Sequence, residues 1–141
     1  MIFGRRFYLV ALSVGFALSS GCGSGRYPVN GIVHYSDGAP VESGTVIAEA
    51  SIDGNLVGVQ ANIEKNGSFQ LGGITPGDGA LPGRYRFAVM PETLGDSELA
   101  AGKTPSVESK FSRFETSGIT FEVKPETNKM DIVVSKPQPK K

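Results

Sequence analysis

The chain has 141 residues, with 14 basic and 14 acidic side chains, one histidine, one cysteine and no tryptophan. A chain of this length holds one small domain, and its balanced charge, with no basic face, argues against nucleic-acid binding. The 19 glycines and 9 prolines follow no repeat period. Because glycine costs about 1 kcal/mol in a helix interior, they favour an all-β domain with many turns over a helical bundle.

Residues 1–21 have the pattern of an export signal. Arg5 and Arg6 precede an apolar run at 7–20, and small residues follow that run. At about 1.5 Å per residue, the run is shorter than the roughly 30 Å hydrocarbon core of a bilayer, so an export signal explains it better than a permanent transmembrane helix. We therefore predict a signal peptide over residues 1–21.

Cys22, the only cysteine, stands where this signal would be cut, in the sequence LSSGCG. The arrangement resembles the bacterial lipoprotein signal, in which the cysteine is lipidated and becomes the first residue of the mature chain. Such signals usually carry leucine three residues before the cysteine, where this chain has Ser19. The alternative is ordinary cleavage that leaves a free thiol. Because an exported lone thiol is open to oxidation and mispairing, lipidation explains the single cysteine better.

Lipidation would place the protein in the bacterial cell envelope, as a lipoprotein facing the periplasm or the cell exterior. Several acyl chains on Cys22 would hold it on a membrane almost irreversibly, because each buried CH₂ contributes about 0.8 kcal/mol. The glycines and serine after the cysteine are typical of a flexible linker. We therefore predict a lipidated cysteine and tether over residues 22–26.

Residues 27–135 show the period-two alternation of a β domain. Apolar side chains recur on one face of runs at 27–35, 44–51, 56–64, 69–71, 84–90, 118–124 and 130–134. Turn residues separate the runs, among them Asp37-Gly38, Asp53-Gly54 and Asn66-Gly67, the last of which predicts a tight hairpin. Both faces of 44–51 are partly apolar, which predicts an interior strand.

The connection at 72–83 is dense in glycine and resembles a phosphate-binding loop only superficially. A phosphate loop leads into a helix N-terminus, whereas this connection leads into the run at 84–90. Its glycines are therefore interpreted as turn residues.

A long segment, 91–118, separates the last two strands from the rest. Because structureless loops of this length are uncommon in compact domains, we expect local helical turns at 96–102 and 106–114. In the second turn, Val107, Phe111 and Phe114 are spaced to face the core together. Residues 136–141 are polar and are predicted to be a disordered tail.

Once the strands are placed, the turn motifs carry a family resemblance. The sequences VNGIVHY at 29–35, DGAPV at 37–41, NGSF at 66–69 and PGRYRFAV at 82–89 resemble the carboxypeptidase regulatory-like, or transthyretin-like, β-sandwich domain. The segment at 110–128 resembles the end of small lipoproteins in that group. The resemblance covers most of residues 27–135. It implies an antiparallel sandwich of about seven strands that accompanies enzymes, receptors or surface proteins without itself catalysing.

No catalytic, metal or cofactor site is predicted. A zinc peptidase needs several converging ligands, and His34 is the only histidine, which the alternation places on the solvent side or at a sheet edge. The aspartates at the turns are too scattered for a calcium loop, and turn chemistry explains them better.

The leading functional hypothesis is a lipid-anchored, non-enzymatic envelope protein with a structural or binding accessory role. The alternative is a carbohydrate- or peptide-binding module that uses the loops at 72–83 and 91–118, because loops on a rigid sandwich commonly carry binding sites. With no tryptophan for stacking, Tyr27, Phe111 and Phe114 would form its binding surface. The partner, an envelope glycan or protein, stays open, and an enzyme is a third, weaker reading.

Overall fold

The computed structural model describes residues 23–139 and confirms an all-β sandwich in that part of the chain. The predicted signal peptide at 1–21 and Cys22 lie outside the described residues. The strands are β1 (Val29–Tyr35), β2 (Thr45–Ile52), β3 (Asn55–Asn62), β4 (Ser68–Gln70), β5 (Gly83–Met90), β6 (Ile119–Val123) and β7 (Asn128–Val134). The helical turns are α1 (Asp96–Ala100), the 3₁₀ turn η1 (Ser109–Ser112) and α2 (Phe114–Ser117). None of the helices among residues 23–139 is long and apolar enough to span a membrane.

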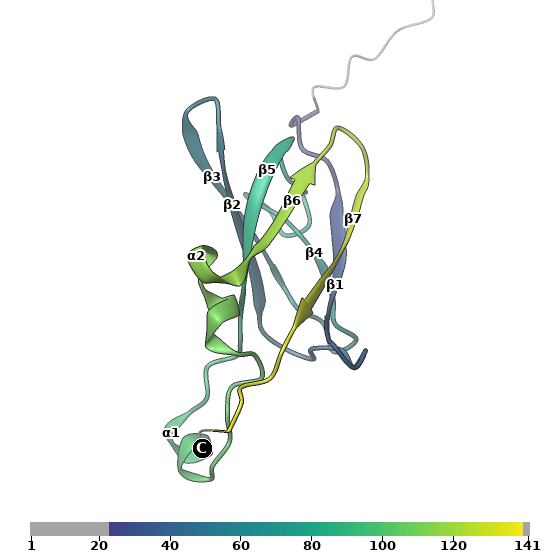
Figure 1. Cartoon of the computed structure of the whole chain (residues 1–141). Helices are drawn as coiled ribbons and strands as arrows, with labels where there is room; N and C mark the ends of the chain where they lie inside the picture. The colour runs from purple at the N-terminus through teal and green to yellow at the C-terminus, as the bar shows by residue number, and fades with distance from the viewer. Residues whose placement is uncertain (1–22, 140–141) are drawn as a thin grey trace, which may run out of the picture.

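The strands form two facing sheets (Figure 1). One sheet has the order β4-β1-β7 and the other has the order β3-β2-β5-β6, so β2 is interior, as predicted. The implied all-antiparallel arrangement is wrong at one place, because β1 and β7 pair in parallel over their whole length. The turn after β6 returns the chain to the end of the sandwich where β1 begins, and β7 then runs beside β1 in the same direction.

The period-two faces predicted from the sequence are the faces that pack. Val33 of β1, Val46 of β2 and Phe87 of β5 are completely buried, and Ile132 of β7 is nearly so. The rings of Tyr85 and Phe87 lie 6.5 Å apart between centroids. Alternation alone therefore identifies the core side of β1, β5 and β7, whereas in β2, where both faces are partly apolar, the structure shows that Val46 and Ala48 face the core.

The segment between β5 and β6 is ordered in two different ways. Residues of α1 are all at least partly exposed, whereas Val107 is 1% exposed and Phe111 packs against the core. Ser117 donates its hydroxyl to the carbonyl of Phe87, and Ser112 donates to Val89 at 3.3 Å. The second half of the segment is thus fastened to β5.

The predicted single helical turn at 106–114 is wrong. Arg113 has φ −129° and ψ 137°, which are extended values, and it separates η1 from α2. This break turns Phe114 away from the core, and the guanidinium of Arg86 lies 5.3 Å from the centre of its ring on the outer face of β5. Only Val107 and Phe111 of the three predicted inward residues pack against the core.

Candidate functional site

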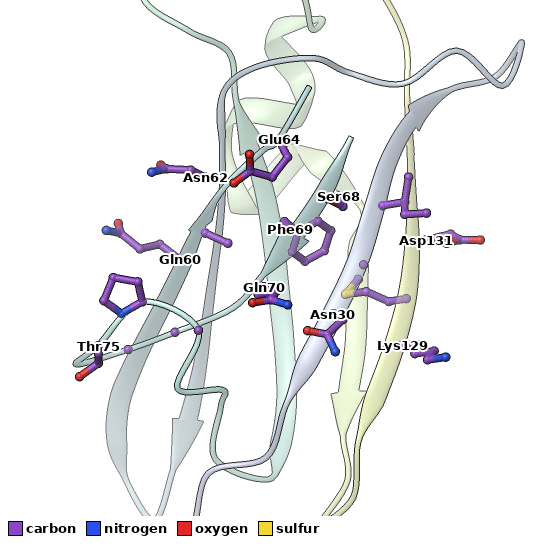
Figure 2. A pocket seen from close by; sticks show the side chains of 18 of the residues that line it. Asn30, Gln60, Asn62, Glu64, Ser68, Phe69, Gln70, Thr75, Lys129 and Asp131 are labelled. Atoms are coloured by element: carbon purple, nitrogen blue, oxygen red, sulfur yellow. The ribbon is translucent and has the colours of Figure 1, made fainter. Parts of the chain in front are cut away.

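A groove of about 960 Å³ lies where the open edges of the two sheets meet (Figure 2). Side chains from β1, β3, β4 and β7 line it, together with the loop at 72–77. Most of its polar lining residues are outward-facing residues of period-two strands: Asn30, Gln60, Asn62, Ser68, Gln70, Lys129 and Asp131. The groove is therefore an open surface in which polar side chains lie among apolar ones on a sheet framework.

The groove follows an interrupted hairpin. The predicted tight turn at Asn66-Gly67 is present, and Glu64 donates its N–H to Ser68 at 2.9 Å beside it. Further along, Gln60 and Gly72 exchange two hydrogen bonds, of 2.9 and 3.0 Å. Between these two points β3 and β4 are not paired, since they belong to different sheets. The prediction of a regular hairpin is therefore wrong, because the two strands turn their apolar side chains to opposite walls of one core.

In a continued hairpin Asn62 would pair with Gln70, but the two residues do not pair. We call this unpaired place the open register position. Leu71 donates its N–H to Val29 of β1, so its neighbour Gln70 directs its own N–H and C=O away from β1. Ile63 likewise donates to the segment that leads into β2, so Asn62 directs its backbone groups away from β2. Both residues line the groove with backbone groups that no strand partner satisfies.

Four carboxamide side chains border the same groove. Asn30 and Gln70 are register partners on β1 and β4, and Gln60 and Asn62 belong to β3 (Figure 2). The carboxamides of Asn55, Asn66 and Asn128 hydrogen bond within the protein, whereas these four make no such bond. Each carboxamide offers one acceptor and two donor hydrogens, so the groove can bind a ligand rich in hydroxyl or amide groups.

The loop at 72–77 is held in place by Asp78. The Asp78 carboxylate accepts hydrogen bonds from the N–H of Gly73 at 2.7 Å, of Thr75 at 3.2 Å and of Ile74 at 3.3 Å. The Gly73 hydrogen bond is the largest of several effects that lower the pKa of Asp78 below its ordinary 3.8, and the charge of Arg26 adds to them. The glycines do serve a turn, and its N–H groups are occupied by the protein's own carboxylate.

Arg26, the last residue of the predicted tether, also contacts this loop. Its guanidinium lies 3.8 Å from the Asp78 carboxylate and donates to the Gly79 carbonyl at 3.1 Å. A Cβ on Gly73 would overlap the Arg26 guanidinium, so a side chain at residue 73 would displace that group. The loop wall of the groove is therefore connected to the first residues of the domain.

The structure does not bring the three predicted binding residues together. Tyr27 is half-buried and forms a bridge with Ala80 near the N-terminal end of the domain. Phe111 and Phe114 lie on η1 and α2, near the other end of β5, and Phe111 has the Lys110 ammonium 4.9 Å from its ring centre. The groove is lined by the loop at 72–77 but by no residue of the 91–118 segment.

The remaining titratable residues form no obvious centre. The Nδ1 atom of His34 lies 3.0 Å from the carbonyl of the next residue, and His34 forms a bridge with Pro40. Residues 23–139 contain no group of three or more metal-ligating side chains. One sequence feature could have indicated the groove, because Asn30, Gln60 and Gln70 place carboxamides on the polar faces of their strands. Alternation, however, does not show that these faces border one groove.

The chain was also compared with known proteins. No protein-family model, curated protein or solved structure matches it.

Proposed function

We propose that the protein is a lipid-anchored, non-enzymatic accessory protein of the bacterial cell envelope, and that its accessory role is binding. The single observation that carries the anchor is the position of Cys22, between the apolar run at 7–20 and the domain that begins at 27. Exposed residues at 23–25 follow, and Arg26 is already bonded to the loop at Gly79. The resemblance to carboxypeptidase regulatory-like domains remains a prediction that agrees with this role.

The short tether has a geometric consequence. Four residues span at most about 14 Å, because an extended chain covers about 3.5 Å per residue. An anchor at Cys22 would therefore hold the end of the sandwich that carries Arg26 and Asp78 close to the bilayer. The opposite end, with α1, would face away from the membrane (Figure 1).

The chemistry of the groove supports binding rather than catalysis. Carboxamides are the most frequent polar side chains in its lining, and they donate and accept hydrogen bonds but do not exchange protons near neutral pH. General acid–base catalysis needs a group whose pKa lies near the working pH. A binding module is therefore the form of accessory function that this surface favours, with the groove as its site.

Metabolic labelling with a palmitate analogue tests the anchor in the full chain. The parent protein should be labelled and membrane-bound, and Cys22→Ala should be unlabelled. Ser24→Ala, a change in the tether that keeps the cysteine, is the matched control and should be labelled like the parent. Label retained in Cys22→Ala, or no label in the parent, would refute the anchor.

A further inference from the structure

The lining of the groove indicates the chemical class of its ligand, an inference that rests on the proposed binding role. Its charged lining residues are Lys129, Asp131 and Glu64, one positive and two negative, so no strong field of one sign selects a charged ligand. The carboxamides of Asn30 and Gln70 instead offer several uncharged donors and acceptors. The matching ligand is neutral and rich in hydroxyl or amide groups.

The open register position adds a more specific requirement. The backbone groups of Asn62 and Gln70 present N–H donors and C=O acceptors at the edges of β3 and β4. Both residues are exposed, so these groups are open to a ligand, and a secondary amide supplies one donor and one acceptor that match them. A ligand that carries such an amide would therefore complete this position as well as bind the side chains.

A secondary amide occurs both in peptides and in acetamido sugars, and the geometry favours the sugar. Strand addition of a peptide uses a row of free backbone groups along an edge. Here the bonds between Glu64 and Ser68 on one side and between Gln60 and Gly72 on the other limit the opening to a single position. The surrounding groove offers side-chain carboxamides and hydroxyls, which suit hydroxyl groups rather than a second peptide unit.

The loop wall supplies an apolar surface for such a ligand. Ile74 is 87% exposed and lies two residues from Pro76, and both line the groove. Asp78 fixes the backbone that carries them, through hydrogen bonds to residues 73–75. We infer that the groove is a binding site for a neutral oligosaccharide that carries acetamido groups. The carboxamide side chains hydrogen bond to the sugar hydroxyls, and the backbone groups of Asn62 and Gln70 hydrogen bond to an acetamido group.

Two matched oligosaccharides test this inference. Isothermal titration calorimetry of the full chain carrying Cys22→Ala should show saturable binding of a tetramer of β-1,4-linked N-acetylglucosamine. Cellotetraose has the same linkage with hydroxyls in place of acetamido groups, and it should bind at least about tenfold more weakly, the effect of losing one hydrogen bond of about 1.4 kcal/mol. Backbone N–H resonances of Asn62 and Gln70 should shift only with the acetylated tetramer.

Variants then locate the site. Asn30→Ala and Gln70→Ala should each weaken binding of the acetylated tetramer about tenfold, since both side chains point outward and their loss leaves the core intact. Asn55→Ala removes an exposed carboxamide at the β2–β3 turn, outside the groove, and is the matched control that should bind like the parent.

The inference would be overturned by equal affinity for the two tetramers or by an Asn55→Ala variant that binds the acetylated tetramer as weakly as Asn30→Ala does. It would also be overturned by binding of a peptide probe, acetyl-tetra-alanine amide, without binding of either sugar. Absence of binding to all three probes would also overturn it. None of these results bears on the lipid anchor, because Cys22 is absent from the protein used. Palmitate labelling at Cys22 likewise leaves the groove untested, so the two proposals fail separately.

Discussion

Gly31 of β1 and Phe69 of β4 are register partners, and the ring of Phe69 occupies the space that a side chain at residue 31 would need. A Cβ on Gly31 would overlap the ring and would lie 2.6 Å from the carbonyl oxygen of Met130. Gly31 therefore leaves room for the Phe69 ring on the inner face of the three-stranded sheet, next to the groove.

We expect Gly31→Ala to lower the free energy of unfolding by about 1–3 kcal/mol, because the added methyl group overpacks the core. Urea denaturation measures the change. Gly58→Ala is the matched control, since a Cβ at residue 58 would meet no atom closer than 4.0 Å. That control should be neutral or stabilising by up to about 1 kcal/mol, and equal losses in the two variants would contradict the packing argument.

The Asp78 carboxylate should make the stability of the loop depend on pH. Its pKa is lowered in the folded protein, chiefly by the Gly73 N–H, so its stabilising contribution is present above the ordinary value of 3.8 and is lost as pH falls through the lower folded value. Asp78→Asn should therefore melt at a lower temperature than the parent at pH 7. The difference should shrink as the pH falls below 3.8.

Two measurements support that test. Thermal melts of Asp96→Asn, which changes an aspartate on the exposed α1, serve as the control and should match the parent. Hydrogen exchange at residues 73–75 should be faster in Asp78→Asn than in the parent at pH 7, because the acceptor of those three N–H groups has lost its charge. Unchanged exchange would show that the loop does not depend on the carboxylate.

The positions of the strands could be predicted from the sequence because each strand buries one face. Alternation predicts the strands and the inward side of most of them, and the Asn66-Gly67 pair predicts the turn between β3 and β4. It could not show that β7 runs parallel to β1, because pairing between chain ends depends on the direction in which the last turn returns the chain. It also did not show that β3 and β4 separate, since a turn motif fixes only its nearest residue pairs.

The groove was less accessible to sequence reasoning than the core. Its carboxamides lie on strands far apart in the chain, as Asn30 and Gln70 show, and they meet only because β1 pairs with β4. Residue type alone predicts a binding surface of Tyr27, Phe111 and Phe114, whereas in the structure Phe111 packs against the core. Residue type indicates what a side chain can do, whereas the sheet order decides what lies next to it.

Neighbouring residues of β5 should respond very differently to truncation. Phe87 is completely buried, so Phe87→Ala should lower the free energy of unfolding by about 3–5 kcal/mol. Arg86 faces outward, where it pairs with Glu49 and lies over the Phe114 ring. Because its side chain is 49% exposed, Arg86→Ala should cost only about 0–1 kcal/mol, and similar losses at the two residues would mean that the register of β5 is wrong.

The segment between β5 and β6 should open in two stages. Its first half, at 92–104, contains α1, which has no buried residue and is closed by an exposed ion pair between Glu98 and Lys103. Such a pair offsets little of the ordering entropy of about 1–2 kcal/mol per residue. This half should therefore exchange its amide hydrogens quickly and be the first place that a protease cuts.

The second half of the segment is held by specific contacts. Val107 is buried, the Thr116 hydroxyl donates to the Lys110 carbonyl at 2.6 Å, and Ser117 bonds to Phe87. Limited proteolysis with trypsin should cut after Lys103 before it cuts after Lys110, although both side chains are exposed. Ser117→Ala removes the bond to Phe87 and should speed cleavage after Lys110 without changing cleavage after Lys103. Faster initial cleavage after Lys110 in the parent would mean that these contacts do not hold η1 and α2 on β5.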